Sequence, residues 1–352
     1  MSKARELAEL GAVYDSGALS NRNMIINGAM AVAQRGTSAT TAGNNVQSTC
    51  DRWISEHTTA AVNLDSEQVT GPTEKGFQYA LKMTAQSTVS LSSAQLLIPF
   101  EHRIERTITN PLRFGTSDAK PFTLSFWIKS NKTGTYVVNL SLNNPSGGTA
   151  DAVSKSYTID AANTWEYKTV TFPANTSTET SSAFNIRSLS IFWWMAAGSN
   201  FTSGTLATSW ENETAANRAV GVTSSLTSGD NWQMTGVQLE VGSEATPFEH
   251  RSYGQEIELC QRYYNTASGM WMSGQSYGSS GNDGLVQVFR FPTEMRANPS
   301  ITFSGGSDGG SSAALYSGGV STSQVNINLR STSGSDFQVW YSGFTTVADA
   351  EI

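Results

Sequence analysis

The sequence predicts an all-β protein whose many short strands form two successive domains. Apolar and polar residues alternate along several stretches, as in Val237 to Val241, and a period of two is typical of a strand with one buried and one solvated face. Clusters of Gly, Asn, Ser and Pro separate these stretches. Charged residues make up only 14% of the 352 residues, while Ser, Thr, Gly and Asn are abundant. Many short strands divided by turns predict a sandwich or a barrel.

Residues 1–20 are predicted to form a short N-terminal helix and a linker. Ser2 is a suitable N-cap, and Gly11 ends the helical pattern. Isolated helices need roughly 12 to 15 residues to be stable in water, so this one needs a packing partner. Leu7 and Leu10 are the candidate contact residues. Two interpretations stay open: the helix packs on its own chain, or it docks the protein on another one, alone or as a small trimeric bundle.

Residues 21–254 are predicted to form the larger β-domain. Its strands follow from alternation, and its turns follow from clusters of Asn, Pro, Ser and Gly. The strand candidates are residues 77–83, 124–129, 157–159, 191–195 and 237–241, and the turn signals are residues 131–134, 143–148 and 228–231.

A strand, a corner and a short helix close this domain. Gly242 stops the last strand, and Pro247 favours an extended conformation for the residue before it. Ser252 and Gln255 form a capping box at the start of a helical pattern. The domain boundary is therefore expected near Gly254.

Residues 255–352 are predicted to form a second, smaller β-domain. Gly and Ser dominate its loops, and little apolar surface remains for a core. A domain of this size gains much from oligomer contacts, so the distal part is expected to associate with copies of itself. The strand candidates are residues 285–291, 300–303, 325–329 and 337–341.

Charge and residue usage exclude several classes of function. The net charge is −7 and no Lys/Arg cluster interrupts it, so no nucleic-acid partner is expected. Cys50 and Cys260 form no Cys-x-x-Cys pair, which favours two reduced thiols over a disulfide; neither a metal nor another cofactor is predicted. No apolar run reaches the roughly 18 residues that span a bilayer, and no signal-peptide core is present, so membrane insertion is not expected.

Five sequence boxes, taken in order, carry a resemblance to a known family. The first combines Asn-Arg-Asn-Met-Ile-Ile-Asn-Gly-Ala-Met with a nearby Gln-Arg-Gly. The boxes are residues 21–36, 51–53, 123–129, 164–167 and 236–264. In this order they resemble a group of bacteriophage virion proteins, chiefly tail fibres and related tail or head appendages.

The resemblance implies a fold and a role. Residues 21–254 would form a jelly-roll β-sandwich of the galactose-binding or carbohydrate-binding-module type, and residues 255–352 a distal β-domain. The protein would be made in the host cytoplasm and carried on the virion as a homotrimer. Its N-terminus would dock on other tail or head proteins, and its body would attach to host surface glycans. The alternative is a purely structural part, such as a head fibre or tail-assembly component, that binds no glycan.

Aromatic residues that face away from the core are the candidate glycan-binding residues. In residues 191–195 one parity faces the core, and the other places Phe192 and Trp194 on the far face of the sheet. Trp127 faces outward by the same alternation. Sugar rings stack on such aromatic faces, although a neighbouring subunit, a loop or a helix of the same chain would also cover them. Further candidates at the distal end are Trp271, Trp340 and Tyr341.

No enzymatic activity is predicted. The sequence has no Gly-x-Ser-x-Gly, P-loop, Gly-x-Gly-x-x-Gly or His-Glu-x-x-His motif, and nothing in it selects a pair of carboxylates for glycoside hydrolysis. Glu240, Glu244 and Glu249 are expected to be solvated.

A Phe-Glu-His-Arg tetrad occurs at Phe100–Arg103 and again at Phe248–Arg251. Each is expected to end a strand with its aromatic ring inside and its charged side chains outside.

Overall fold

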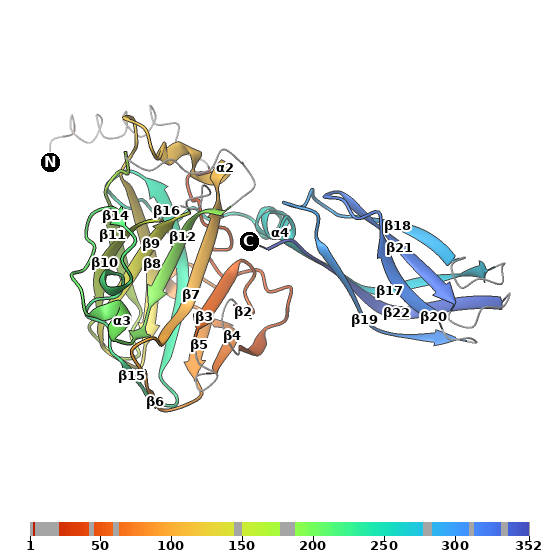
Figure 1. Ribbon diagram of the computed structural model, residues 1–352, viewed down its shortest axis with the longest axis horizontal. Helices are drawn as coiled ribbons and strands as arrows, with labels where there is room; N and C mark the ends of the chain where they lie inside the picture. Colours follow the sequence, from red (N-terminus) through yellow and green to blue (C-terminus); the bar gives the residue numbers. More distant parts are fainter. Residues whose placement is uncertain are drawn as a thin grey trace. The chain divides into compact units, whose positions relative to one another are not determined.

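The chain divides into two compact units, Met1–Tyr253 and Gly254–Ile352, whose elements are labelled in Figure 1. The computed structural model describes Lys3 and residues 21–41, 46–58, 63–143, 150–176, 187–276, 284–309, 313–331 and 337–351. Apart from Lys3, the predicted N-terminal helix, with Leu7 and Leu10, lies outside the described residues.

The first unit contains two large antiparallel sheets. Sheet A consists of β1 (Ser38–Thr41), β4 (Leu64–Thr70), β5 (Tyr79–Ala85), β8 (Phe122–Ser130), β11 (Glu166–Phe172) and β16 (Asn231–Val241). Sheet B consists of β2 (Val46–Gln47), β3 (Trp53–His57), β7 (Leu96–Glu105), β9 (Gly134–Leu142), β10 (Asp151–Ile159), β12 (Arg187–Trp194), β13 (Ala196–Ala197) and β14 (Glu211–Asn212). The strand order is β1-β4-β5-β16-β8-β11 in sheet A and β14-β10-β9-β12-β7-β3-β2 in sheet B, with β13 beside β7.

Short elements connect these strands. The strands β6 (Val89–Ser90) and β15 (Ser225–Leu226) form a pair of their own. The helical turns are η1 (Thr73–Lys75), α2 (Arg106–Thr109), η2 (Asn110–Leu112), α3 (Ser199–Thr202) and η3 (Ala215–Asn217).

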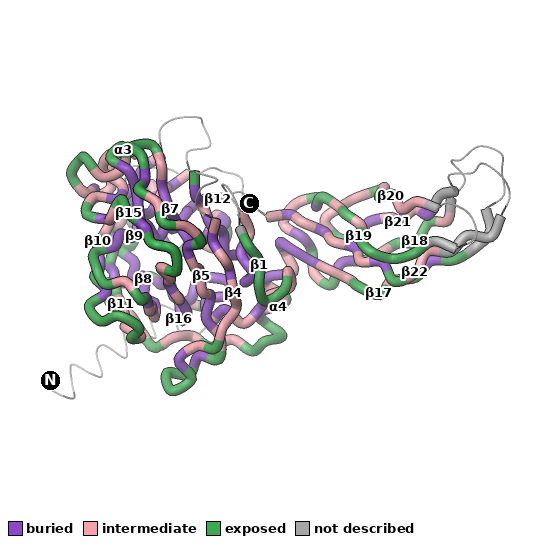
Figure 2. The backbone as a smooth tube through the Cα atoms, turned by 90° about the horizontal axis from the view of Figure 1, so that it is seen from below, coloured by how far each residue is buried: buried purple, intermediate pink, exposed green. Residues whose placement is uncertain are grey.

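Apolar side chains from both sheets meet in one core. The ring centroids of Phe126 in β8 and Trp193 in β12 are 5.8 Å apart, and Trp53 in β3 lies 5.6 Å from Trp193. Ile191 and Met195 belong to the same buried cluster, which confirms the parity expected for residues 191–195. Figure 2 shows buried residues, in purple, along the strands of both sheets. Alternation along each strand therefore builds a two-layer sandwich, and the predicted all-β class is confirmed.

The second unit is also built from strands. Helix α4 (Tyr253–Gln261) precedes β17 (Tyr264–Ser276), β18 (Gly284–Arg290), β19 (Ser300–Gly309), β20 (Ala313–Gly318), β21 (Gln324–Ser331) and β22 (Phe337–Asp349). These strands form two three-stranded sheets, β17-β22-β19 and β18-β21-β20. A small cluster around the fully buried Ile327, Leu329 and Phe344 forms the core.

The strand predicted at residues 300–303 is longer than expected. It continues to Gly309 through Gly305 and Gly306, whose φ angles are 66° and 83°. A Cβ atom on Gly306 would lie 2.8 Å from the ring of Tyr341, closer than a side chain allows. These glycines therefore let the strand pass a close contact instead of ending it.

Candidate functional site

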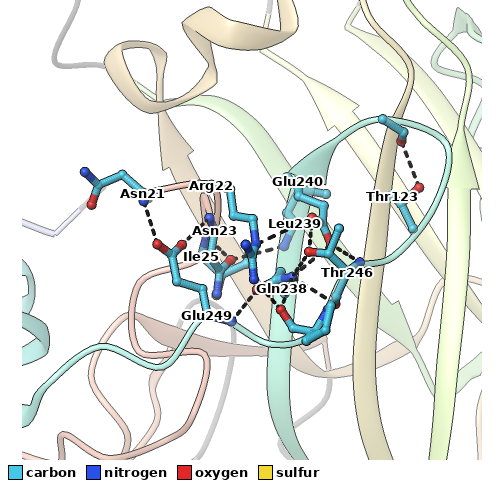
Figure 3. Close-up of polar contacts among 12 residues, drawn as sticks. Asn21, Arg22, Asn23, Ile25, Thr123, Gln238, Leu239, Glu240, Thr246 and Glu249 are labelled. Atoms are coloured by element: carbon cyan, nitrogen blue, oxygen red, sulfur yellow. Dashed lines mark hydrogen bonds and ion pairs between the residues drawn. The ribbon is translucent and has the colours of Figure 1, made fainter. Parts of the chain in front are cut away.

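The N-terminal box, which we define as residues 21–30, lies against β16, a strand near the end of the first unit in sequence (Figure 3). The backbone N–H of Met24 donates to the carbonyl of Leu239 at 2.9 Å. The side chain of Asn23 donates to the carbonyl of Val237 at 3.1 Å and accepts the N–H of Leu239 at 3.1 Å. The box thus satisfies backbone groups of β16 beyond Met234, where the pairing with β5 has ended, while β8 pairs with the other edge of β16.

The carboxylates of this region hold the fold together. Glu249 accepts the backbone N–H of Asn23 at 2.8 Å. Glu240 is buried and accepts both the N–H of Thr246, at 2.8 Å, and its hydroxyl, at 2.6 Å. The prediction of solvated side chains is wrong for Glu240, because the N-terminal box and the chain after β16 cover it, and Glu249 is half-buried. It is confirmed for Glu244, which is exposed.

The two Phe-Glu-His-Arg tetrads have different surroundings and form no repeated site. In the first, Glu101 and Arg103 of β7 leave the core as expected, although Glu101 is fully buried, whereas His102 lies in the core 4.9 Å from the ring of Trp53, so the expectation is wrong for His102. Nε2 of His102 accepts the backbone N–H of Ile26 at 3.4 Å, and burial holds the pKa of this imidazole well below 6.5. In the second, the ring of His250 lies 5.4 Å from that of Phe77.

Aromatic and lysine side chains gather on the outer face of sheet A. Trp127 of β8 is half-buried beside Tyr167 of β11, which is 44% exposed, and their ring centroids are 5.3 Å apart. The ammonium of Lys75 lies 5.5 Å from the centroid of Trp127, and that of Lys129 lies 5.0 Å from the centroid of Trp165. We call these five residues the aromatic face.

The lysines of the aromatic face differ from others on this sheet. Lys82 pairs with Glu67 at 3.0 Å, whereas Lys75 and Lys129 form no ion pair with another described residue. Partial burial, followed by the charge of Lys82, lowers the pKa of Lys129. Two ammonium groups are thus held over indole rings with their hydrogen-bonding capacity available.

Phe192 and Trp194 lie on the far face of sheet B, as predicted, but neither is an exposed aromatic face. Both are buried beneath the segment 198–222, with Phe201 packed on Trp194 at 5.2 Å between centroids. The guanidinium of Arg218 lies 5.1 Å from each of the two rings. The prediction of a ligand-binding role is therefore wrong for Trp194, because a loop of the same chain covers it completely, which alternation cannot reveal; Phe192 lines a pocket described below.

The distal candidates lie on the sheet of β17 and β22. Trp271 is 62% exposed. Tyr341 is half-buried and packs on Phe344, with ring centroids 5.8 Å apart. Trp340 pairs with Ser273 through its backbone, and its side chain lies outside the described part of the chain. Of the three, Trp271 alone presents a largely accessible ring among the side chains described.

A polar pocket on the outer face of sheet B was not predicted from the sequence. Its volume is about 340 Å³, and we call it the charged pocket. Its charged lining residues are Glu56, Glu101, Arg103, Arg187, Glu213 and Arg218. They come from β3, β7, β12 and the segment 198–222, so no sequence motif joins them. The available signal was Glu101, a carboxylate inside an otherwise apolar stretch of β7.

Other kinds of site were searched within the described ranges. No group of three or more His, Cys, Asp or Glu is placed there to hold a metal ion. Cys50 and Cys260 are free and buried, in agreement with the expectation of reduced thiols. None of the described helices has the length and apolar character needed to cross a membrane.

Comparisons with known proteins gave structural likenesses only. No protein-family model and no curated protein matches the sequence. The enzymatically active domain of tailspike protein 4 from bacteriophage CBA120 is 11% identical at a TM-score of 0.32; the match covers 62% of this chain and 21% of that one. The family 11 carbohydrate-binding module of a Clostridium thermocellum cellulase is 10% identical at a TM-score of 0.31; the match covers 59% of this chain and 97% of that module. The module TmCBM61, bound to β-1,4-galactotriose, is 12% identical at a TM-score of 0.29; the match covers 63% of this chain and 99% of that module.

Proposed function

We propose that the first unit binds glycans and that the aromatic face is its binding surface. The observation that carries this proposal is the pair of the half-buried Trp127 and the exposed Tyr167, which lie side by side on neighbouring strands of one sheet face. Sugar rings present apolar C–H groups that stack on aromatic faces. The free ammonium groups of Lys75 and Lys129 can donate to hydroxyl oxygens beside the rings. The residues would thus provide both the stacking area and the polar contacts that orient a sugar.

A glycan array probed with the full chain tests this proposal. Trp127→Ala and Tyr167→Ala are expected to weaken binding about tenfold each, because aromatic contacts contribute about 0.5–1.5 kcal/mol beyond the area they bury. Tyr253→Ala is the matched control, since Tyr253 is 61% exposed and lies outside the aromatic face. Unchanged binding in both variants would overturn the assignment. Dissociation of an oligomer on mutation of Trp127 would instead favour the purely structural role.

We further infer that the protein is a bacteriophage virion component, made in the host cytoplasm, that attaches the particle to host surface glycans. The order of the five sequence boxes supports this role, as does the arrangement of a β-sandwich followed by a second β-unit. Weak single contacts gain orders of magnitude in avidity when several arms engage one surface. Immunogold labelling of assembled particles, with adsorption to host cells measured in the presence of competing protein, tests the placement. Particles that carry no label would contradict it.

A homotrimer is part of this proposal. Four large apolar side chains of the second unit are exposed: Trp271, Val286, Val288 and Tyr316, at 62%, 59%, 49% and 45%. A neighbouring subunit would remove this surface from water. Light scattering of the full chain is expected to give three times the mass of one chain, and Val286→Asp is expected to lower it. A monomeric mass for the unaltered protein would contradict the trimer.

A further inference from the structure

The charged pocket holds three carboxylates and three guanidinium groups, and four of the six are already paired. Glu101 accepts from Nε of Arg103 at 2.6 Å and from a terminal nitrogen of the same side chain at 3.1 Å. Glu213 accepts from Arg218 at 3.1 Å and from the hydroxyl of Ser141 at 2.7 Å. Such bidentate and shared hydrogen bonds fix these groups in place.

Arg218 also anchors the floor of the pocket. Its Nε donates to the side-chain oxygen of the fully buried Asn139 at 3.0 Å, and its planar group covers Phe192 and Trp194. The backbone carbonyl of Arg218 accepts the hydroxyl of Ser154 at 2.9 Å. The segment 198–222 is therefore held on sheet B by polar and aromatic contacts, and it supplies one wall of the pocket.

Glu56 and Arg187 are the two remaining charged groups. Neither side chain makes a hydrogen bond or an ion pair with another residue in the described ranges, although both line the same cavity. Their effects on each other are electrostatic at longer range. A half-buried carboxylate and a half-buried guanidinium without direct protein partners can offer their hydrogen-bonding groups to a partner in the cavity. The cavity between them is the place where such a partner would sit.

The chemistry of the pocket selects the kind of partner. Its lining charges sum to zero, so it gives no net preference for a cation or an anion. A hydroxyl group can donate to a carboxylate and accept from a guanidinium at the same time. A ligand rich in hydroxyls therefore matches both free groups. The volume of about 340 Å³ corresponds to roughly ten water molecules at about 30 Å³ each, which is room for one sugar ring.

We propose that the charged pocket binds a single neutral sugar residue, with Glu56 accepting a proton of one hydroxyl and Arg187 donating to a hydroxyl oxygen. This site is separate from the aromatic face and lies on the opposite sheet of the sandwich. It would recognise the end of a glycan chain or one branching residue, whereas stacking on an open face suits the body of a chain. Specificity would come from the fixed polar groups around the ring.

The ionisation of Glu56 gives the site a pH signature. Burial, followed by the nearby charge of Glu101, raises the pKa of Glu56 above its ordinary 4.5, while Arg103, Arg187 and Arg218 oppose the rise. Protonation removes the charge that accepts the sugar hydroxyl. Affinity is therefore expected to fall as the pH decreases through this raised pKa, and the fall should disappear in Glu56→Gln.

Calorimetric titration of the full chain with a panel of neutral aldohexoses, at neutral and acidic pH, tests the proposal. At least one sugar is expected to bind, and Glu56→Gln and Arg187→Gln are each expected to weaken it tenfold or more. Glu67→Gln, on the outer face of sheet A, is the matched control, and Trp127→Ala should leave this binding unchanged. The latter result separates this site from the aromatic face. Circular dichroism establishes that each variant is folded.

Three results would overturn the proposal. The first is the absence of a heat of binding with every aldohexose at a sugar concentration of roughly 10 mM, which is ten times a dissociation constant of about 1 mM. The second is equal affinity in the unaltered protein and in both pocket variants. The third is hydrolysis of an aryl glycoside that Glu56→Gln abolishes, since a carboxylate with a raised pKa would then be acting as a general acid.

Discussion

The carboxylate of Glu249 accepts the backbone N–H of Asn23 at 2.8 Å, and so joins two residues that are 226 positions apart in the sequence. The same carboxylate accepts the backbone N–H of Asn21 at 2.5 Å. Because Asn23 also bonds to Val237 and Leu239, one short segment ties the start of the first unit to its last strand. The first and last sequence boxes of the unit are thus two sides of a single structural contact.

Removing the Glu249 carboxylate is expected to destabilise the first unit. Glu249→Ala leaves the backbone N–H of the buried Asn23 without its acceptor, a loss that costs about 1–3 kcal/mol when the group is shielded from water, whereas the exposed Asn21 can bond to solvent. Glu249→Gln keeps one acceptor oxygen and should lose less. Denaturant unfolding followed by tryptophan fluorescence measures both, with the exposed Glu244→Ala as control. Equal midpoints for Glu249→Ala and Glu244→Ala would show that the contact contributes nothing to stability.

Gly236 is expected to tolerate no side chain. Its φ is +61°, and a Cβ atom there would lie 2.6 Å from the ring of Phe77. Gly236→Ala should therefore lower stability by about 1–3 kcal/mol, from backbone strain and from displacement of a buried ring. Gly242→Ala is the matched control, because its φ is also positive while its surroundings are open. Thermal unfolding compares the two; a loss no larger at Gly236 would leave strain alone as the cause.

His102 is expected to make the first unit acid-sensitive. Burial, and next the charge of Arg52, hold its folded-state pKa well below 6.5, so the folded protein keeps this ring neutral while the unfolded chain takes up a proton. The contribution of His102 to the free energy of unfolding is constant above about pH 6.5. Below that value it declines as the pH falls, by at most about 1.36 kcal/mol per pH unit.

The variant His102→Gln separates this effect from other acid-induced losses. It should be less stable than the unaltered protein at pH 7.5, because Ile26 loses its partner in the packed site. The difference should shrink as the pH is lowered towards 5. Unfolding midpoints across this range measure it, and parallel curves would show that His102 does not titrate differently in the two states.

Trp194 is expected to serve stability instead of binding. It is fully buried between sheet B and the segment 198–222, so Trp194→Ala should cost about 3–5 kcal/mol, as deletion of a large core side chain does. Trp127→Ala, at a half-buried position, should cost much less. Chemical unfolding of the two variants compares them. A stable Trp194→Ala protein that lost glycan binding would contradict the assignment of Trp194 to the core.

The periodicity of the sequence was sufficient for the fold class and for many strand positions. Alternation is a local property of the strand, so the strand at residues 237–241 could be predicted without knowing any partner. All five residues 191–195 are apolar, so alternation alone left open which parity faces the core, and the structure assigns it to Ile191, Trp193 and Met195. The helix after Pro247 likewise follows from local capping signals, and α4 confirms it. Composition also predicted free thiols at Cys50 and Cys260.

What covers each sheet face was decided only by the tertiary structure. Alternation can place Phe192, Trp194 and Glu240 outside the core, but it cannot show that a loop or a distant segment then buries them. For the same reason it missed the charged pocket, whose residues are joined by sheet pairing and by the path of residues 198–222. Contacts between segments far apart in sequence depend on where the chain folds back, and a period of two carries no information on that path.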